Sequence, residues 1–171
     1  TEIVPGVFVH NPPPAPLTPE NGGDIANLGV VIGDDSVAVI DPGGSRAIGE
    51  ALFAAIRART DKPVTAVIIT HMHPDHSFGA EVFAEAGAEV IGHDNLASGI
   101  ERRAQTWAES IPAQAGALAM LGTRPRLPDR GIDTPEDITL GGATLRLVPV
   151  ATAHTDNDLT VYHVESGTLF T

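Results

Sequence analysis

Hydrophobic residues in the first part of the chain follow the spacings of strands and of one helix. Apolar positions from Ile3 to Val9 predict a strand, and the nearly continuous apolar run at 64–70 predicts a second strand that is buried on both faces. Ser45 is a residue type that caps helices, and the spacing after it predicts a helix that ends before Lys62. The apolar face of this helix consists of Ile48, Leu52, Ala55 and Ile56.

The second part of the chain continues this mixture of helices and strands. Apolar spacing predicts a short helix before Gly87 and a helix-rich insertion at 93–130, in which Trp107 is expected to anchor the core. A pair of glycines at 141–142 predicts a hairpin turn. The strands expected here are 89–91, 138–140 and 144–148.

Residue types that bind metal ions are concentrated directly after the buried strand, in the sequence His-Met-His-Pro-Asp-His at 71–76. Side chains two residues apart share a face only in extended backbone, so His71 and His73 can reach one ion if this segment is not helical. Pro74 favours extended backbone at His73, because the residue before a proline is pushed away from helical geometry. The sequence therefore predicts a metal site at the carboxyl end of the strand, where open α/β sheets place ligands.

Asp75 and His76 are adjacent in the chain, and their side chains are expected to point toward a second metal position. Imidazole nitrogens with a carboxylate oxygen suit Zn²⁺, and they also suit iron or manganese. Another interpretation stays open for the aspartate, which could cap a helix that begins near Ser77. Three histidines have no neighbour at ligand spacing and are expected to have structural roles: His10, His93 and His163.

The sequence His-x-His-x-Asp-His at 71–76, followed by Gly79, resembles the signature of the metallo-β-lactamase-fold hydrolases. Residues 27–43 are similar to the opening hairpin of that family, which ends in an Asp-x-Gly turn. Residues 153–159 are similar to the family segment that supplies a third metal-binding histidine, although Ala153 stands where glycine is usual. Within the family, the chain looks most like the zinc metallohydrolases associated with quinoprotein-relay and sulfur-oxidation systems.

Two features separate the chain from other branches of the family. Diiron flavoproteins carry a glutamate at the position of His73, so the resemblance favours the hydrolytic zinc enzymes. The chain has no cysteine, and it therefore lacks the thiolate ligand that one β-lactamase subclass uses.

The resemblance implies an α/β fold, the αββα sandwich, in which residues 1–171 form a single, incomplete domain. They correspond to the N-terminal half and the first strands of the second half. In the family, the strand that corresponds to 166–171 runs into a Gly-Asp pair whose aspartate bridges both metals. We therefore expect at most one tightly bound metal here, and completion of the domain by a missing C-terminal segment or by a second copy of the chain.

The resemblance also implies the roles of the site residues. The implied metal ligands are His71, His73 and His154 for a first ion and Asp75 and His76 for a second. Asp75 would in addition orient the metal-bound hydroxide, which makes it the expected catalytic residue. Asp41 or Asp158 could hold an imidazole ring in the correct orientation, as carboxylates beside metal sites commonly do.

The implied function is hydrolysis by one or two Zn²⁺ ions. A metal-bound hydroxide would attack an acyl, ester, thioester or lactam carbon of a small-molecule substrate. Two alternatives stay open. Some relatives use the same histidines for a single Fe²⁺ and oxidise persulfides, and a fragment of this family could bind metal without catalysing a reaction.

Composition limits the possible partners and locations. The net charge of −12 and the isoelectric point near 4.7 disfavour a nucleic-acid partner, because binding a phosphate backbone needs clustered Lys and Arg. The chain has no apolar tract of about 18 residues, so no membrane span is expected. The subfamily resemblance favours a periplasmic or secreted location, with the cytoplasm as the alternative.

Overall fold

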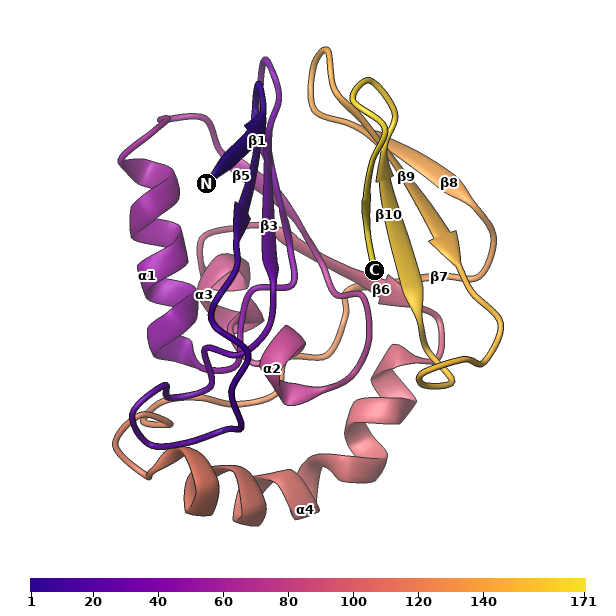
Figure 1. The fold of residues 1–171 in the computed structure, drawn as a ribbon. Coiled ribbons are helices and arrows are strands. Elements are labelled where there is room, and N and C mark those ends of the chain that lie inside the picture. Colours follow the sequence, from indigo (N-terminus) through magenta and orange to yellow (C-terminus); the bar gives the residue numbers. More distant parts are fainter.

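Two β-sheets face each other in the computed structural model, which describes residues 1–171, and helices lie on the outer side of the larger sheet (Figure 1). In Figure 1 the smaller sheet, orange to yellow, lies on the right and helices α1 and α3 on the left. The layers therefore follow the order helix, sheet, sheet. This arrangement confirms the predicted α/β class and corresponds to the first three layers of the αββα sandwich.

The larger sheet contains both antiparallel and parallel strands. Its strands, in spatial order, are β1 (Glu2–Val4), β2 (Val7–His10), β3 (Leu28–Ile32), β4 (Val37–Ile40), β5 (Val64–Ile68), β6 (Glu89–His93) and β7 (Arg130–Ile132). Neighbours from β1 to β4 are antiparallel, and neighbours from β4 to β7 are parallel. Parallel neighbours need crossover connections, which the helices provide. These are α1 (Arg46–Arg57), α2 (Pro74–Ser77), α3 (Ala80–Glu85) and α4 (Leu96–Ala115).

The smaller sheet is entirely antiparallel. Its strands are β8 (Glu136–Thr139), β9 (Thr144–Pro149), β10 (Leu159–His163) and β11 (Thr168–Phe170), in the spatial order β11-β10-β9-β8. The predicted hairpin is present, with the glycine turn between β8 and β9. Both glycines have positive φ angles, of 63° and 76°, which explains why residues without a Cβ stand there.

Helix α1 begins where its capping residue predicts. The Ser45 hydroxyl accepts a hydrogen bond from the Ile48 backbone N–H at 3.4 Å, and Ser45 itself has extended backbone angles. On the face that the apolar spacing indicated, Ile56 is buried and Leu52 is half-buried against the same core. The helix ends at Arg57, before Lys62 as expected.

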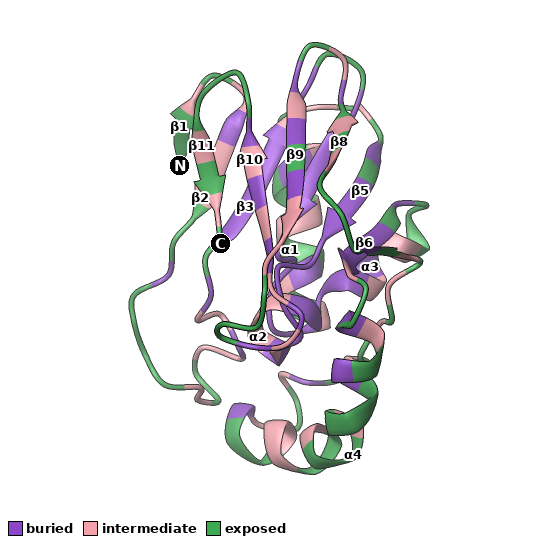
Figure 2. Ribbon diagram, turned by 90° about the vertical axis from the view of Figure 1, so that its right-hand side faces the viewer, coloured by how far each residue is buried: buried purple, intermediate pink, exposed green.

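Strand β5 lies at the centre of the molecule and is buried on both faces, as Figure 2 shows. Val67 and Ile69 pack in the core between the larger sheet and the helices, while Ala66 and Ile68 pack in the core between the two sheets. Each fully buried Val or Ile contributes about 1.5–3 kcal/mol relative to an exposed one. The continuous apolar run is therefore the consequence of a strand between two layers.

Two sequence-based assignments were wrong. Residues 3–9 form a hairpin of β1 and β2 instead of one strand, because Pro5 lacks an N–H and Gly6 has a φ of 80°, so the chain reverses there. The segment after α4 ends in a strand, β7, which pairs with β6 and was not predicted.

None of the helices combines the length and the hydropathy that a membrane crossing requires.

The central position of β5 leads to a prediction about stability. We expect Ile68→Ala to lower the free energy of unfolding by about 2–5 kcal/mol, because a fully buried side chain is replaced by a cavity. Thr65→Ala in the same strand, at an exposed position, should change it by less than about 1 kcal/mol. Urea titrations followed by circular dichroism measure both, and equal effects would contradict the role of β5 as the core strand.

Candidate metal centre

The residues after β5 keep the metal-binding motif out of helical geometry. His73 has φ −59° and ψ 144°, the extended conformation that Pro74 was expected to impose. Helix α2 begins at Pro74, three residues before the predicted start near Ser77, because proline is well accommodated in the first turn of a helix. Asp75 lies inside this first turn, and the residue at the cap position is His73, without a side-chain capping bond. The interpretation of Asp75 as a helix cap is therefore wrong.

Three histidine rings converge at the carboxyl end of β5. His154 comes from the loop between β9 and β10, 81 residues after His73, and its Nε2 lies 3.0 Å from Nδ1 of His73. Nε2 of His71 lies 3.1 Å from the same Nδ1. One nitrogen from each ring lies within 4.8 Å of the others, an arrangement that could hold a metal ion. The expected convergence of the motif with the downstream histidine is thus present.

The spacing and charge state of these rings fit a bound cation. Nitrogen ligands about 2.0–2.1 Å from one ion lie about 2.9–3.4 Å apart when the angles at the ion are between about 90° and tetrahedral. Burial, together with the nearby His76, His73 and His154, lowers the pKa of His71 to about 3, and burial is also the main cause that lowers the pKa of His73. Both rings are therefore neutral at pH 7, the form that binds metals. The cluster thus implies a metal ion.

Asp75 and His76 form a separate pair beside the three histidines. Nε2 of His76 lies 3.4 Å from Oδ2 of Asp75, and the rings of His76 and His71 are 4.1 Å apart between centroids. The two side chains thus share one small region next to the cluster, and their role in a second metal position stays a prediction. Burial lowers the pKa of His76, but the hydrogen bond and charge of Asp41 and the charge of Asp75 outweigh it, so that the net pKa is raised.

The buried carboxylate of Asp41 orients two of the four motif side chains. Its Oδ2 accepts hydrogen bonds from Nδ1 of His76 at 2.7 Å and from the Thr70 hydroxyl at 2.7 Å. The Thr70 oxygen in turn lies 3.0 Å from Nδ1 of His71. With both Nδ1 atoms used as donors in this network, the neutral ring of His71 keeps the lone pair of its Nε2 for a ligand, and the ring of His76 is held with its Nε2 near Asp75. Of the two aspartates that could hold an imidazole ring, Asp41 is therefore one that contacts such a ring.

Asp158 fixes a loop backbone instead of an imidazole ring. Its carboxylate accepts hydrogen bonds from the backbone N–H groups of His154 and Thr155 and from the Thr155 hydroxyl. Burial raises the pKa of Asp158, but these hydrogen bonds lower it by more, so the net pKa lies below its usual range. The expectation that Asp158 holds a ring is wrong; it holds the turn that carries His154.

Sequence reasoning missed Asn157, which connects the two halves of the site. Its side chain is fully buried, and its Oδ1 accepts a hydrogen bond of 2.8 Å from the backbone N–H of Met72, between the two motif histidines. Close by, the backbone N–H of Leu159 donates to the carbonyl of Thr70 at 2.7 Å. Thr70 was also missed, although a polar residue at the end of a buried apolar run was a visible signal.

A cavity of about 390 Å³ opens beside the cluster. His71, His154 and Asp158 line it, and so does Thr171 at the end of the described chain. Its volume falls in the range of small-molecule sites, about 300–1,000 Å³. The arrangement can therefore hold a small substrate next to a metal ion.

The three isolated histidines lie outside this centre and make local contacts, as expected. His10 pairs with Asp24 at 2.7 Å, and Nδ1 of His93 accepts the backbone N–H of Asn95. His163 is buried, with Nδ1 2.7 Å from the Ser166 hydroxyl. Trp107 packs edge-on against Phe78, which agrees with its expected core role.

Comparisons with known structures agree with this fold. The structure is similar to the metallo-beta-lactamase from Pontibacter korlensis, with a TM-score of 0.71 and 21% identity over 99% of this chain and 68% of that one. The metallo-beta-lactamase from Hirschia baltica has a TM-score of 0.72 and 19% identity, and the match covers 99% of this chain and 68% of that one. A metallo-beta-lactamase family protein from Thermus thermophilus has a TM-score of 0.69 and 25% identity, and the match covers 98% of this chain and 59% of that one.

The chain thus spans between 59% and 68% of the length of these three structures. A comparison with curated proteins found no match. The family model described as the metallo-beta-lactamase superfamily matches residues 21–171, which is most of the chain and includes all the histidines of the cluster. The chain therefore belongs to the metallo-β-lactamase superfamily.

Proposed function

We propose that the protein is a zinc-dependent hydrolase of small molecules with an acyl, ester, thioester or lactam carbon. The observation that carries this proposal is the cluster of three histidine nitrogens, two of whose residues, His71 and His154, line a cavity of about 390 Å³, in a superfamily whose members are mostly metal-dependent hydrolases. Three imidazole nitrogens are a common ligand set of catalytic zinc, which leaves one position open. A periplasmic or secreted location and the absence of a nucleic-acid partner stay predictions.

In this proposal each residue of the centre has a distinct role. His71, His73 and His154 hold the first ion, and Asp75 and His76 contribute to a second position. When bound, zinc supplies a Lewis acid and lowers the pKa of a coordinated water toward neutrality. The carboxylate of Asp75, 3.4 Å from Nε2 of His76, accepts a proton from the attacking water and orients it.

The remaining side chains hold these groups in place. Asp41 keeps the ring of His76 in one tautomer, and through the Thr70 hydroxyl it does the same for His71. Asp158 fixes the backbone at His154. Removing a contact of this kind commonly lowers metal affinity or activity by about 10- to 100-fold.

The first prediction of this proposal concerns metal affinity. We expect His73→Ala to weaken zinc binding by more than about 100-fold, because a ligand nitrogen is removed from the centre of the cluster. His163→Ala removes a buried histidine that is not part of the cluster, so it should lower stability and leave zinc affinity unchanged. Calorimetric titration with ZnCl₂ measures both, and equal zinc affinities would show that the ligands are assigned wrongly.

A second prediction concerns the number and kind of metal ions. Residues 1–171 supply three nitrogens to the first position and two groups to the second, so we expect one zinc per chain to remain after dialysis. Metal analysis of protein purified without chelators measures this ratio. Two firmly held ions per chain would contradict the expectation, and iron in place of zinc would favour the persulfide dioxygenase.

A third prediction separates catalysis from metal binding. Asp75→Asn should lower the hydrolysis rate by about 100-fold or more while the first zinc stays bound, because Asp75 is outside the histidine cluster. The rate is measured on the protein in its natural length with a panel of thioester, lactone and β-lactam substrates. Metal-loaded protein that hydrolyses none of them would support the alternative of a domain that binds metal without catalysis.

A fourth prediction tests the contact between the two halves of the site. Asn157→Ala should weaken zinc binding by about tenfold, because the backbone N–H between His71 and His73 loses its buried acceptor. Asn95→Ala is the matched control. The exposed side chain of Asn95 donates a hydrogen bond to the backbone carbonyl of Asp156, the neighbour of Asn157, so this variant should change zinc affinity little. The same zinc titration compares them, and equal losses would remove the special role of Asn157.

A further inference from the structure

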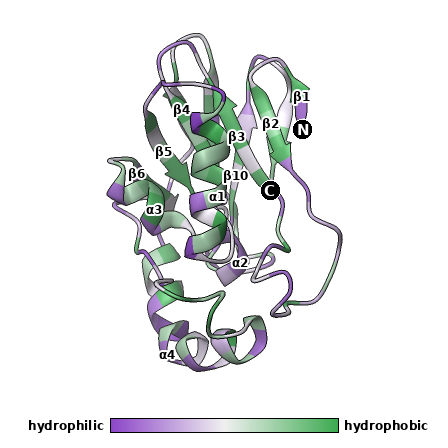
Figure 3. Cartoon of the chain, turned by 90° about the vertical axis from the view of Figure 1, so that its left-hand side faces the viewer, coloured by the Kyte–Doolittle hydropathy of each residue, from purple (hydrophilic) through white to green (hydrophobic).

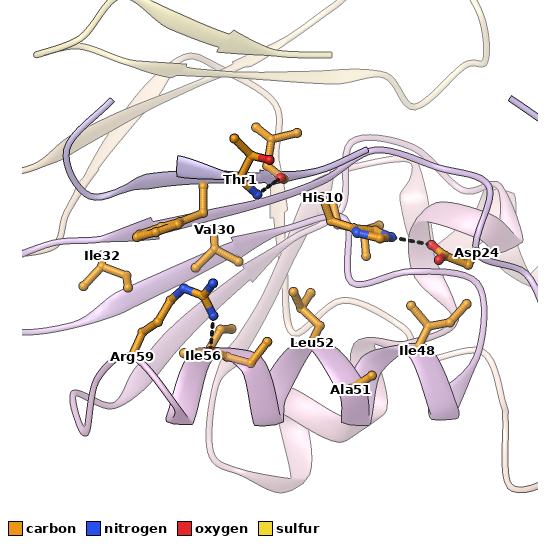
Figure 4. Close-up of a pocket in the computed structure, with 14 residues that line it drawn as sticks. Thr1, His10, Asp24, Val30, Ile32, Ile48, Ala51, Leu52, Ile56 and Arg59 are labelled. Atoms are coloured by element: carbon orange, nitrogen blue, oxygen red, sulfur yellow. Dashed lines mark hydrogen bonds and ion pairs between the residues drawn. The ribbon is translucent and has the colours of Figure 1, made fainter. Parts of the chain in front are cut away.

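A second cavity lies away from the metal centre, between α1 and strands β2 and β3 (Figure 4). Its volume is about 310 Å³, within the range of small-molecule sites. None of the residues that line it also lines the cavity beside the histidines. It is therefore a separate feature of the fold, on the outer side of the larger sheet.

The walls of this cavity are mainly apolar. Ten of its 14 lining residues are hydrophobic, and Figure 3 shows the hydrophobic colouring of β2 and β3 beside α1. Val30 and Ile32 line it from the sheet, and Leu52 and Ile56 from the helix, as Figure 4 shows. It runs along α1 from Ile48 to Ile56, about 12 Å at the rise of an α-helix, and reaches Arg59 just beyond the end of the helix. The shape is that of an elongated apolar slot.

The two ends of the slot differ in charge. At one end His10 and Asp24 are paired with each other, with Nε2 of His10 2.7 Å from Oδ1 of Asp24. At the other end the guanidinium of Arg59 lies over the ring of Phe8, 5.5 Å from its centroid, and donates to the backbone carbonyl of Ala55. It makes no ion pair, although acidic residues outnumber Lys and Arg by 22 to 10 in this chain. Arg59 is thus the only Lys or Arg side chain that lines the slot, and it lies at one end.

We infer that this slot binds an unbranched aliphatic carboxylate of medium chain length. The methylene chain lies between α1 and β3, where it is removed from water, and the carboxylate binds the exposed guanidinium of Arg59. The inference is independent of the proposed hydrolase activity, because no residue of the slot belongs to the metal centre. It concerns binding alone and includes no chemical step.

The experiment is a calorimetric titration of the chain with decanoate and, separately, with decanol, which has the same chain without the charge. We expect saturable decanoate binding with one site per chain. Arg59→Gln should weaken decanoate binding by about five- to tenfold and leave decanol binding unchanged, because only the carboxylate uses the guanidinium.

Two tryptophan variants test the location. Ala55 is exposed on α1 and lines the slot, so Ala55→Trp should fill it and abolish decanoate binding without disturbing the core. Ala54→Trp is the matched control, because Ala54 is also exposed but does not line the slot. The control should bind decanoate like the parent protein. Decanoate binding should also persist in His73→Ala, which distinguishes this site from the metal centre.

Several results would overturn the inference. Absence of saturable decanoate binding, equal weakening of decanoate and decanol by Arg59→Gln, or equal loss in Ala54→Trp and Ala55→Trp would each contradict it. Loss of decanoate binding in His73→Ala, when circular dichroism shows that this variant is folded, would indicate that decanoate binds at the metal centre instead. A dimer seen by light scattering that Ala55→Trp dissociates would show that a second copy of the chain fills the slot instead.

Discussion

The buried carboxylate of Asp41 is the constraint on which the metal centre depends. It directly follows β4 and accepts hydrogen bonds from the backbone N–H and hydroxyl of Thr70 and from the ring of His76. A buried charge is costly unless it is fully hydrogen-bonded, so these three groups are held together at the ends of adjacent parallel strands. Asp41 also has a φ of 55°, a left-handed conformation that aspartate tolerates better than most residues.

The centre is assembled from both sheets, and two hydrogen bonds join the parts. The N–H of Met72 donates to the side chain of Asn157, and the N–H of Leu159 donates to the carbonyl of Thr70. Through them the loop that carries His154 is fixed against the motif that carries the other two histidines. A metal ion bound by all three rings would add to this connection, because an ion that binds only the folded chain stabilises it.

Predictions made from local residue types were largely correct. Ser45 predicted the start of α1, and the continuous apolar run predicted the burial of β5. Pro74 predicted extended backbone at His73, although it also starts α2 earlier than expected. The hairpin of β1 and β2 was missed because Pro5 and Gly6 were read within an apolar run and not as a turn. The third histidine was expected only because a downstream segment resembles that of a known family.

The sequence by itself thus determined most of the element types, the buried strand and the non-helical motif, because backbone geometry over a few residues depends on neighbouring side chains. Only the tertiary structure decided that His154 lies 3.0 Å from His73, that Asn157 binds Met72, and that an apolar slot remains between α1 and β3. Contacts between residues about 80 positions apart depend on how two sheets pack, and many alternative pairings share the same local pattern. No spacing along the chain encodes them.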